Sequence, residues 1–96
     1  MADWVFLTKQ GLALLYIAQH PQSTLHEIAL ALDTTPRTVH RVLEDLERAG
    51  YITWQRTGRG NIYQISALRR MKHGLIKDSS VGELLKLLVS KRREKN

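Results

Sequence analysis

The side chains best suited to bind another molecule lie in a short basic stretch near the middle of the chain. Here Arg37-Thr38-Val39-His40-Arg41 follows a proline, and Thr35 precedes that proline. A planar guanidinium group donates in a fork that fits the two acceptors on a guanine edge, and a hydroxyl or imidazole group can reach a base edge or a phosphate. The chemistry predicted for these side chains is hydrogen bonding to nucleic acid, and the candidates are Thr35, Arg37, Thr38, His40 and Arg41.

A second basic group surrounds a turn rich in glycine. The runs 51–56 and 62–65 are rich in β-branched and aromatic residues, and residues 57–61 between them have turn chemistry. This pattern predicts a β-hairpin with Arg59 at its tip, where a guanidinium group can enter a minor groove or pair with phosphates. Arg56 and Asn61 join Arg59 as expected DNA-binding residues.

Residues that could support catalysis or hold a metal do not converge. The chain has no cysteine, which excludes disulfides, thiolate metal sites and cysteine nucleophiles. His20, His26 and His73 lack the i, i+4 pairing of a zinc site, and Ser80 is better explained as a helix cap. We therefore expect no enzymatic activity, no bound metal and no cofactor.

The charge distribution agrees with a polyanionic partner. The chain has a formal net charge of +6. Residues 1–33 are net negative, whereas residues 34–73 hold eight Lys and Arg against three acidic residues and residues 74–96 hold six against three. A concentrated positive field attracts nucleic acid, although a small basic protein can also be merely soluble.

The first two helices have recognisable starts. Thr8 is a potential N-cap for a helix over 9–19, in which apolar residues recur at positions 12, 15 and 16. This spacing predicts that Leu12 and Leu15 belong to the core. Thr24 and Glu27 read as a capping box for a second helix that runs to about residue 32.

A tight turn over 33–35 leads into the helix that carries the first basic group. Pro36 fits the first turn, where its missing N–H has no intrahelical partner. Val39, Leu43 and Leu46 form an inward stripe, and Gly50 ends the helix. The basic residues then occupy the exposed N-terminal half, while the acidic residues follow in the C-terminal half. A merely soluble helix would be expected to mix its charges along its length.

The last helix carries an apolar stripe that the expected core does not require. Ser80 and Glu83 form a second capping box, and the stripe follows it. Uncovered apolar surface of this kind usually marks an interface, so we expect a homodimer, with packing on the same subunit as the alternative. Aromatic residues such as Trp54 are assigned to the core or to an interface rather than to base stacking. The expected interface residues are Trp4, Phe6, Val81, Leu84, Leu85 and Leu88.

These elements predict a mainly α fold with a small β-hairpin, a winged helix-turn-helix with an additional C-terminal helix. The DNA-binding domain would span 1–78, with the helix-turn-helix at 24–49 and the wing at 51–65, and 79–96 would form the dimerisation helix and a basic tail. Resemblance to a known family rests on 4–8, 28–29, 37–41, 45–51, 58–63 and 80–85. These segments resemble the small regulators labelled MarR-like or ArsR-like. The resemblance implies DNA binding through the helix that begins at Pro36 and through the wing, and it implies a dimer.

The leading functional expectation is a sequence-specific regulator of transcription that binds double-stranded DNA. The alternative is a winged-helix module that docks protein or RNA. A basic C-terminal helix lying on an anionic membrane is a weaker possibility. The longest apolar run, 12–18, is far short of the roughly 20 residues that cross a bilayer, so the expected location is the cytoplasm.

Overall fold

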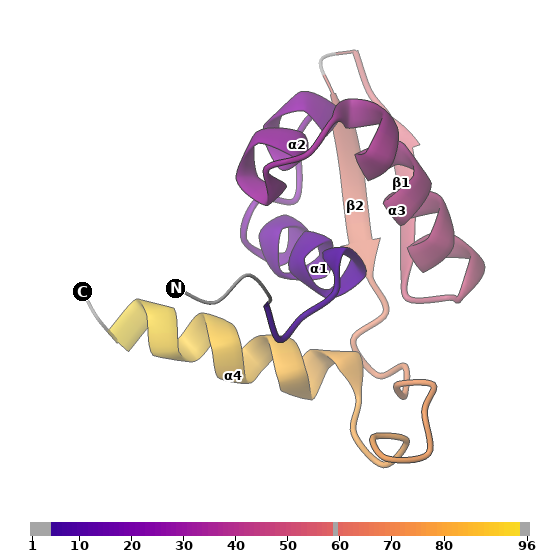
Figure 1. Ribbon diagram of the computed structural model, residues 1–96, viewed down its shortest axis with the longest axis vertical. Coiled ribbons are helices and arrows are strands. Elements are labelled where there is room, and N and C mark those ends of the chain that lie inside the picture. Colours follow the sequence, from indigo (N-terminus) through magenta and orange to yellow (C-terminus); the bar gives the residue numbers. More distant parts are fainter. Residues whose placement is uncertain (1–4, 59, 95–96) are drawn as a thin grey trace.

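The computed structural model describes residues 5–58 and 60–94 (Figure 1). These residues form four helices and a two-stranded antiparallel hairpin. In the last helix, side chains are described only as far as residue 89. The elements are α1 (Lys9–Gln19), α2 (Leu25–Leu32), α3 (Pro36–Arg48), β1 (Ile52–Arg56), β2 (Asn61–Ile65) and α4 (Val81–Glu94). The predicted winged helix-turn-helix with an additional C-terminal helix is confirmed.

Helices α1 and α2 begin at the predicted caps. The hydroxyl of Thr8 accepts from the backbone N–H of Gly11 at 3.2 Å. At the start of α2 the hydroxyl of Thr24 accepts from the N–H of Glu27, and the Glu27 carboxylate accepts from the N–H of Thr24. These bonds satisfy donors that have no partner within a helix, which is why the local sequence could predict them.

The turn between α2 and α3 depends on a left-handed residue. Asp33 has φ 56° and ψ 50°, a conformation that Asp tolerates better than most residues. Its N–H donates to the carbonyl of Leu30 at 3.3 Å, and the N–H of Thr34 donates to that of Ala29 at 2.9 Å. Ala29 is buried, so its small side chain lets the neighbouring elements approach closely. The sharp turn expected at Asp33 is confirmed.

The core lies between the first three helices, the hairpin and the start of α4. Leu15, assigned to it from the sequence, is partly buried and packs against it, whereas the assignment of Leu12 was wrong, because Leu12 is only partly buried and lies outside this cluster. Helix α1 instead buries the opposite stripe of Ala13, Leu14 and Ile17. Both stripes are apolar at helical spacing, and packing on α3, β2 and α4 selects between them. The buried core residues are Ala13, Leu14, Ile17, Ile28, Ala29, Val39, Val42, Leu43, Leu46, Ile52, Tyr63, Val81 and Leu85.

The hairpin lies beside α3 and is attached to the loop between α1 and α2. Strand β1 contacts α3, and its Trp54 lies opposite Tyr63 of β2. The backbone N–H of Tyr63 also donates to the carbonyl of Pro21 at 3.0 Å. At the turn, the N–H of Thr57 donates to the carbonyl of Gly60 at 2.7 Å. The hairpin is thus fixed both to α3 and to the loop between α1 and α2.

Helix α4 packs across α1 at the end of the molecule opposite the wing tip (Figure 1). Its capping box is confirmed, with the N–H of Glu83 donating to the Ser80 hydroxyl at 3.2 Å and the N–H of Ser80 donating to the Glu83 carboxylate at 2.7 Å. Hydrogen bonding of the Glu83 carboxylate to Ser80, through the Ser80 backbone N–H first and its side chain second, lowers the pKa of that carboxyl. Val81 and Leu85 are 2% and 7% exposed, so their assignment to a dimer interface was wrong. Each contributes about 1.5–3 kcal/mol to the subunit's own core when fully buried.

Candidate nucleic-acid interface

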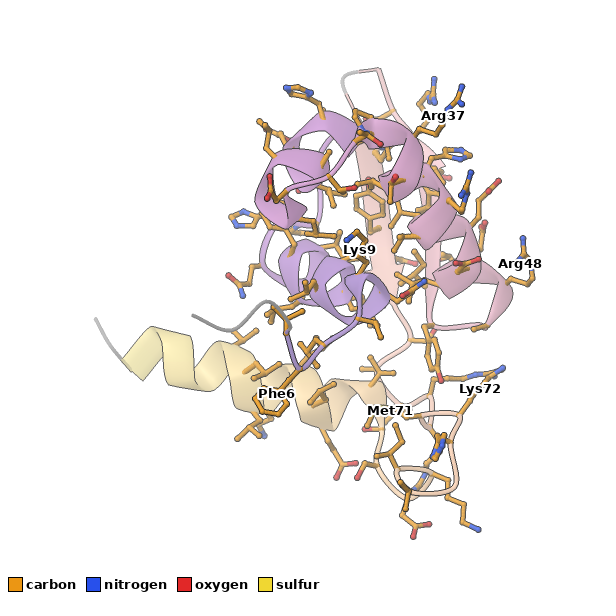
Figure 2. All side chains as sticks on the ribbon, in the orientation of Figure 1. Phe6, Lys9, Arg37, Arg48, Met71 and Lys72 are labelled. Atoms are coloured by element: carbon orange, nitrogen blue, oxygen red, sulfur yellow. The ribbon has the colours of Figure 1, made fainter. Side chains whose placement is uncertain are left out.

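The exposed half of α3 presents the predicted basic residues away from the fold. Arg37, His40 and Arg41 are exposed, Thr38 is partly exposed, and the inward face is buried. Figure 2 shows Arg37 projecting outward at the N-terminal end of α3 and Arg48 at the opposite end. The folded protein therefore places cations where a duplex can approach the first turns of the helix.

Thr35 and Thr38 together shape the N-terminus of α3. The Thr35 hydroxyl accepts from the backbone N–H of Thr38 at 3.2 Å and donates to the Thr38 hydroxyl at 3.1 Å. The first N–H groups of a helix and its dipole favour a phosphate at this end. Thr35 is therefore the N-cap of α3, and both hydroxyls lie at the helix end where a phosphate would approach.

Acidic residues occupy the other half of α3. Asp45 accepts from the Gln10 side chain at 3.2 Å and pairs with Arg48 at 3.5 Å. The Glu44 carboxylate lies 3.8 Å from Nδ1 of His40. These carboxylates would repel a phosphate backbone, so the charge along α3 favours DNA contact near its N-terminus.

Trp54 is the neighbour of the basic group that sequence reasoning missed. Its ring meets the His40 imidazole edge-on, with centroids 5.8 Å apart and an interplanar angle of 77°. On its other side Trp54 stacks on Tyr63 at 5.9 Å and 24°. Residues 40 and 54 belong to different elements, and no spacing rule relates them.

Of the three DNA-binding residues predicted in the wing, the structure describes two, and only one of these is exposed. Arg56 is exposed at the end of β1, whereas Arg59 lies outside the described residues. Asn61 is 5% exposed, and its side-chain amide donates to the Tyr63 hydroxyl at 3.0 Å. The expectation that Asn61 faces DNA needs correction, because this residue is used inside the base of the wing.

Tyr63 completes that internal network. Its hydroxyl donates to the carbonyl of Ser23 at 3.2 Å, and the side chain is 4% exposed. Burial raises the pKa of the Tyr63 phenol, while its bond with Asn61 lowers the pKa by a smaller amount. A protonated phenol is what donation to the Ser23 carbonyl requires.

The predicted interface residues outside the core differ in how exposed they are. Trp4 lies outside the described residues, and Phe6 is 92% exposed (Figure 2). Leu84 and Leu88 on α4 are partly buried. Leu87, which the sequence stripe omitted, is 59% exposed and is the most open leucine described on α4. The outer face of α4, defined as Leu84, Leu87 and Leu88, thus remains available to a partner.

Other kinds of site find little support in the described part of the chain. The described residues contain no group of three or more His, Asp or Glu side chains that could hold a metal ion. No helix over the described residues is long and apolar enough to cross a membrane.

A pair of helices joined by a tight turn, followed by a hairpin beside the second helix, defines a winged helix-turn-helix protein. Residues 7–60 match the sequence model of the MarR family. The chain belongs to the MarR family. This match resolves the earlier resemblance, which included both MarR-like and ArsR-like regulators.

Solved structures show the same fold at low sequence identity. A MarR family transcription regulator shares 18% identity at a TM-score of 0.54, covering 94% of this chain and 54% of its own. MepR, a transcription regulator of the multidrug efflux pump MepA of Staphylococcus aureus, shares 22% identity at a TM-score of 0.52. The match covers 92% of this chain and 61% of the MepR chain. A point mutant of S. aureus MepR bound to an oligodeoxyribonucleotide shares 22% identity at a TM-score of 0.53, and the match covers the same shares of the two chains. The chain therefore spans somewhat more than half the length of these structures. Among curated proteins, none matches it significantly.

Proposed function

We propose that this protein is a sequence-specific regulator of transcription that binds double-stranded DNA as a homodimer. Helix α3 enters the major groove, and the wing lies on the adjacent backbone or minor groove. The observation that carries the proposal is the polarity of α3, with exposed Arg37 and Arg41 in its N-terminal half and the carboxylates beyond them. The MepR mutant bound to an oligodeoxyribonucleotide supports DNA as the class of ligand.

Each group has a proposed role in the complex. Arg37 and Arg41 donate to base edges, and guanine is the base that a guanidinium group reads best. Thr35 and Thr38 contact a phosphate at the helix N-terminus. His40 contacts a base edge or a phosphate, and the wing arginines 56 and 59 contact the backbone or minor groove. The proposed function is binding, without catalysis or a cofactor, and the expected location is the cytoplasm.

The dimer would join two such surfaces. A single recognition helix reads only a few base pairs, whereas two helices about 34 Å apart read half-sites one turn of duplex apart. The outer face of α4 is the proposed contact, because Leu87 is 59% exposed and Leu84 and Leu88 are partly exposed beside it. Residues 1–78 would then serve as the DNA-binding part and 79–96 as the dimerisation element.

Selection from a random DNA pool, followed by affinity measurements, tests the proposal. Arg41→Ala and Arg37→Ala should each weaken binding to the selected site by about 1–3 kcal/mol and relax preference at one base position. Arg48→Ala is the matched control, because Arg48 is at the acidic end of α3 and pairs with Asp45. It should leave base preference unchanged.

Two outcomes would contradict this assignment. Equal losses on the selected site and on random duplex would make Arg37 and Arg41 phosphate contacts only. Failure of the unmodified protein to enrich any sequence, with affinity for duplex that hardly responds to salt, would favour a protein-docking module, since DNA binding weakens steeply as counterions are released.

A further inference from the structure

An aromatic chain connects the proposed DNA-reading surface to the centre of the fold. It runs from His40 on α3 to Trp54 on β1, then to Tyr63 on β2, and ends at the carbonyl of Ser23 before α2. Only the first member belongs to the exposed basic group. The other members come from three different segments of the polypeptide and lie on the inner side of His40.

The inner part of this chain is firmly held. Tyr63 is 4% exposed, its hydroxyl bonds to Asn61 and Ser23, and its backbone N–H bonds to Pro21. Trp54 stacks on this anchored ring with an interplanar angle of 24°. A ring packed against such a support has few alternative rotamers, so Trp54 offers His40 a fixed surface.

His40 would have more freedom without that surface. Its side chain is 46% exposed, and Trp54 is its aromatic contact. On α3 itself, Glu44 lies 3.8 Å from Nδ1 and Arg41 is next along the chain. Nδ1 is the nitrogen on the side of the Glu44 carboxylate, at a distance longer than a hydrogen bond, so Nε2 on the other side of the ring is the nitrogen we assign to a ligand.

We infer that Trp54 is a positioning residue for DNA recognition, which orients His40 so that its imidazole discriminates at one base pair. This inference rests on the proposed function. Trp54 does not touch DNA in this scheme and acts only through His40. A side chain held in one orientation loses little conformational entropy on binding, so its hydrogen bond contributes more to discrimination than that of a freely rotating one.

A double-mutant cycle separates positioning from simple structural support. We expect His40→Ala to reduce preference at one base pair by a factor of about ten, the discrimination of a lost base contact. Trp54→Leu should relax preference at the same base pair and should add nothing further in the His40→Ala background. Trp54→Phe, which retains an aromatic ring, should restore part of the preference.

The control is Gln55→Leu, a substitution at the exposed neighbouring position of β1. It should leave base preference intact, and thermal unfolding should confirm that each variant is folded. If Trp54→Leu does not fold, Trp54→Phe carries the cycle, with a smaller effect that again vanishes in the His40→Ala background.

The proposal is overturned if Trp54 substitution weakens binding equally on all sequences, or changes base preference equally with and without His40. Either result would make Trp54 a structural residue alone. Failure of the proposed function is distinguishable, because then the unmodified protein itself would show no base preference.

Discussion

Removing one buried oxygen, with Tyr63→Phe, should loosen the wing while leaving the aromatic stack in place. The Tyr63 hydroxyl accepts from the Asn61 amide at 3.0 Å and donates to the Ser23 carbonyl at 3.2 Å. Asn61 and Ser23 are only 5% and 4% exposed, so water does not readily replace the lost partner. Phenylalanine keeps the ring that stacks on Trp54.

The size of the effect follows from the groups left unsatisfied. A buried donor or acceptor that loses its partner costs about 1–3 kcal/mol, and here one donor and one acceptor are affected. We expect the free energy of unfolding to fall by about 2–3 kcal/mol, which lowers the Tm of a domain of this size by roughly 10–20 °C. DNA affinity should fall as well, because the network fixes the base of the wing.

The assay is urea unfolding at neutral pH, with Tyr51→Phe as the matched control. The Tyr51 hydroxyl donates to the Arg70 carbonyl at 3.4 Å in an exposed setting, so its removal should change the free energy of unfolding by less than about 0.5 kcal/mol. Asn61→Leu combined with Tyr63→Phe should be less destabilised than the sum of the two single variants, because no polar donor is then left unpaired.

The same network predicts how stability responds to alkali. Burial raises the pKa of Tyr63 in the folded state above its value in the unfolded chain. The stabilisation from the protonated phenol is therefore fully present below the unfolded pKa of about 10 and is lost as pH rises through the folded pKa. Tyr63→Phe should lack this component of the alkaline loss. The reasoning is refuted if Tyr63→Phe is no less stable than Tyr51→Phe, or if their alkaline profiles coincide.

Two further predictions concern the turn and the dimer. Because Asp33 has φ 56°, Asp33→Val should lower the free energy of unfolding by about 1–2 kcal/mol, whereas Asp33→Gly should preserve it. Chemical unfolding measures both variants, and equal effects would contradict the role of the left-handed conformation. Leu87→Asp should yield folded monomers with weaker binding to a two-half-site operator, because it places a charge on the outer face of α4. Sedimentation showing that the unmodified protein is already monomeric would refute the dimer, and Lys86→Asp at an exposed neighbouring position serves as the control.

Local chemistry explains why much of the fold could be predicted from the sequence. The caps at Thr8, Thr24, Thr35 and Ser80 bond only three residues along the chain, so the sequence contains both partners. The left-handed turn at Asp33 depends likewise on that residue and its neighbours. The exposed position of the basic group on α3 followed from the apolar stripe opposite it.

Contacts between distant segments account for the errors. Helix α1 is apolar on both candidate faces, and only packing against other elements buries Ala13 and Ile17 instead of Leu12. Asn61 has the chemistry of a DNA contact, but the fold turns its amide to Tyr63. Val81, which fits a dimer stripe, instead belongs to the buried core of its own subunit.

The sequence by itself determined where helices begin, where the chain turns and which half of α3 is basic, because these depend on interactions within a few residues. Tertiary structure alone decided what stands behind the basic surface. It placed the rings of Trp54 and His40 with their centroids 5.8 Å apart. It also placed Gly82 so close to the Ala67 carbonyl that an added Cβ would lie 2.8 Å from the oxygen. Such proximities depend on the packing of whole elements, which no spacing along the chain specifies.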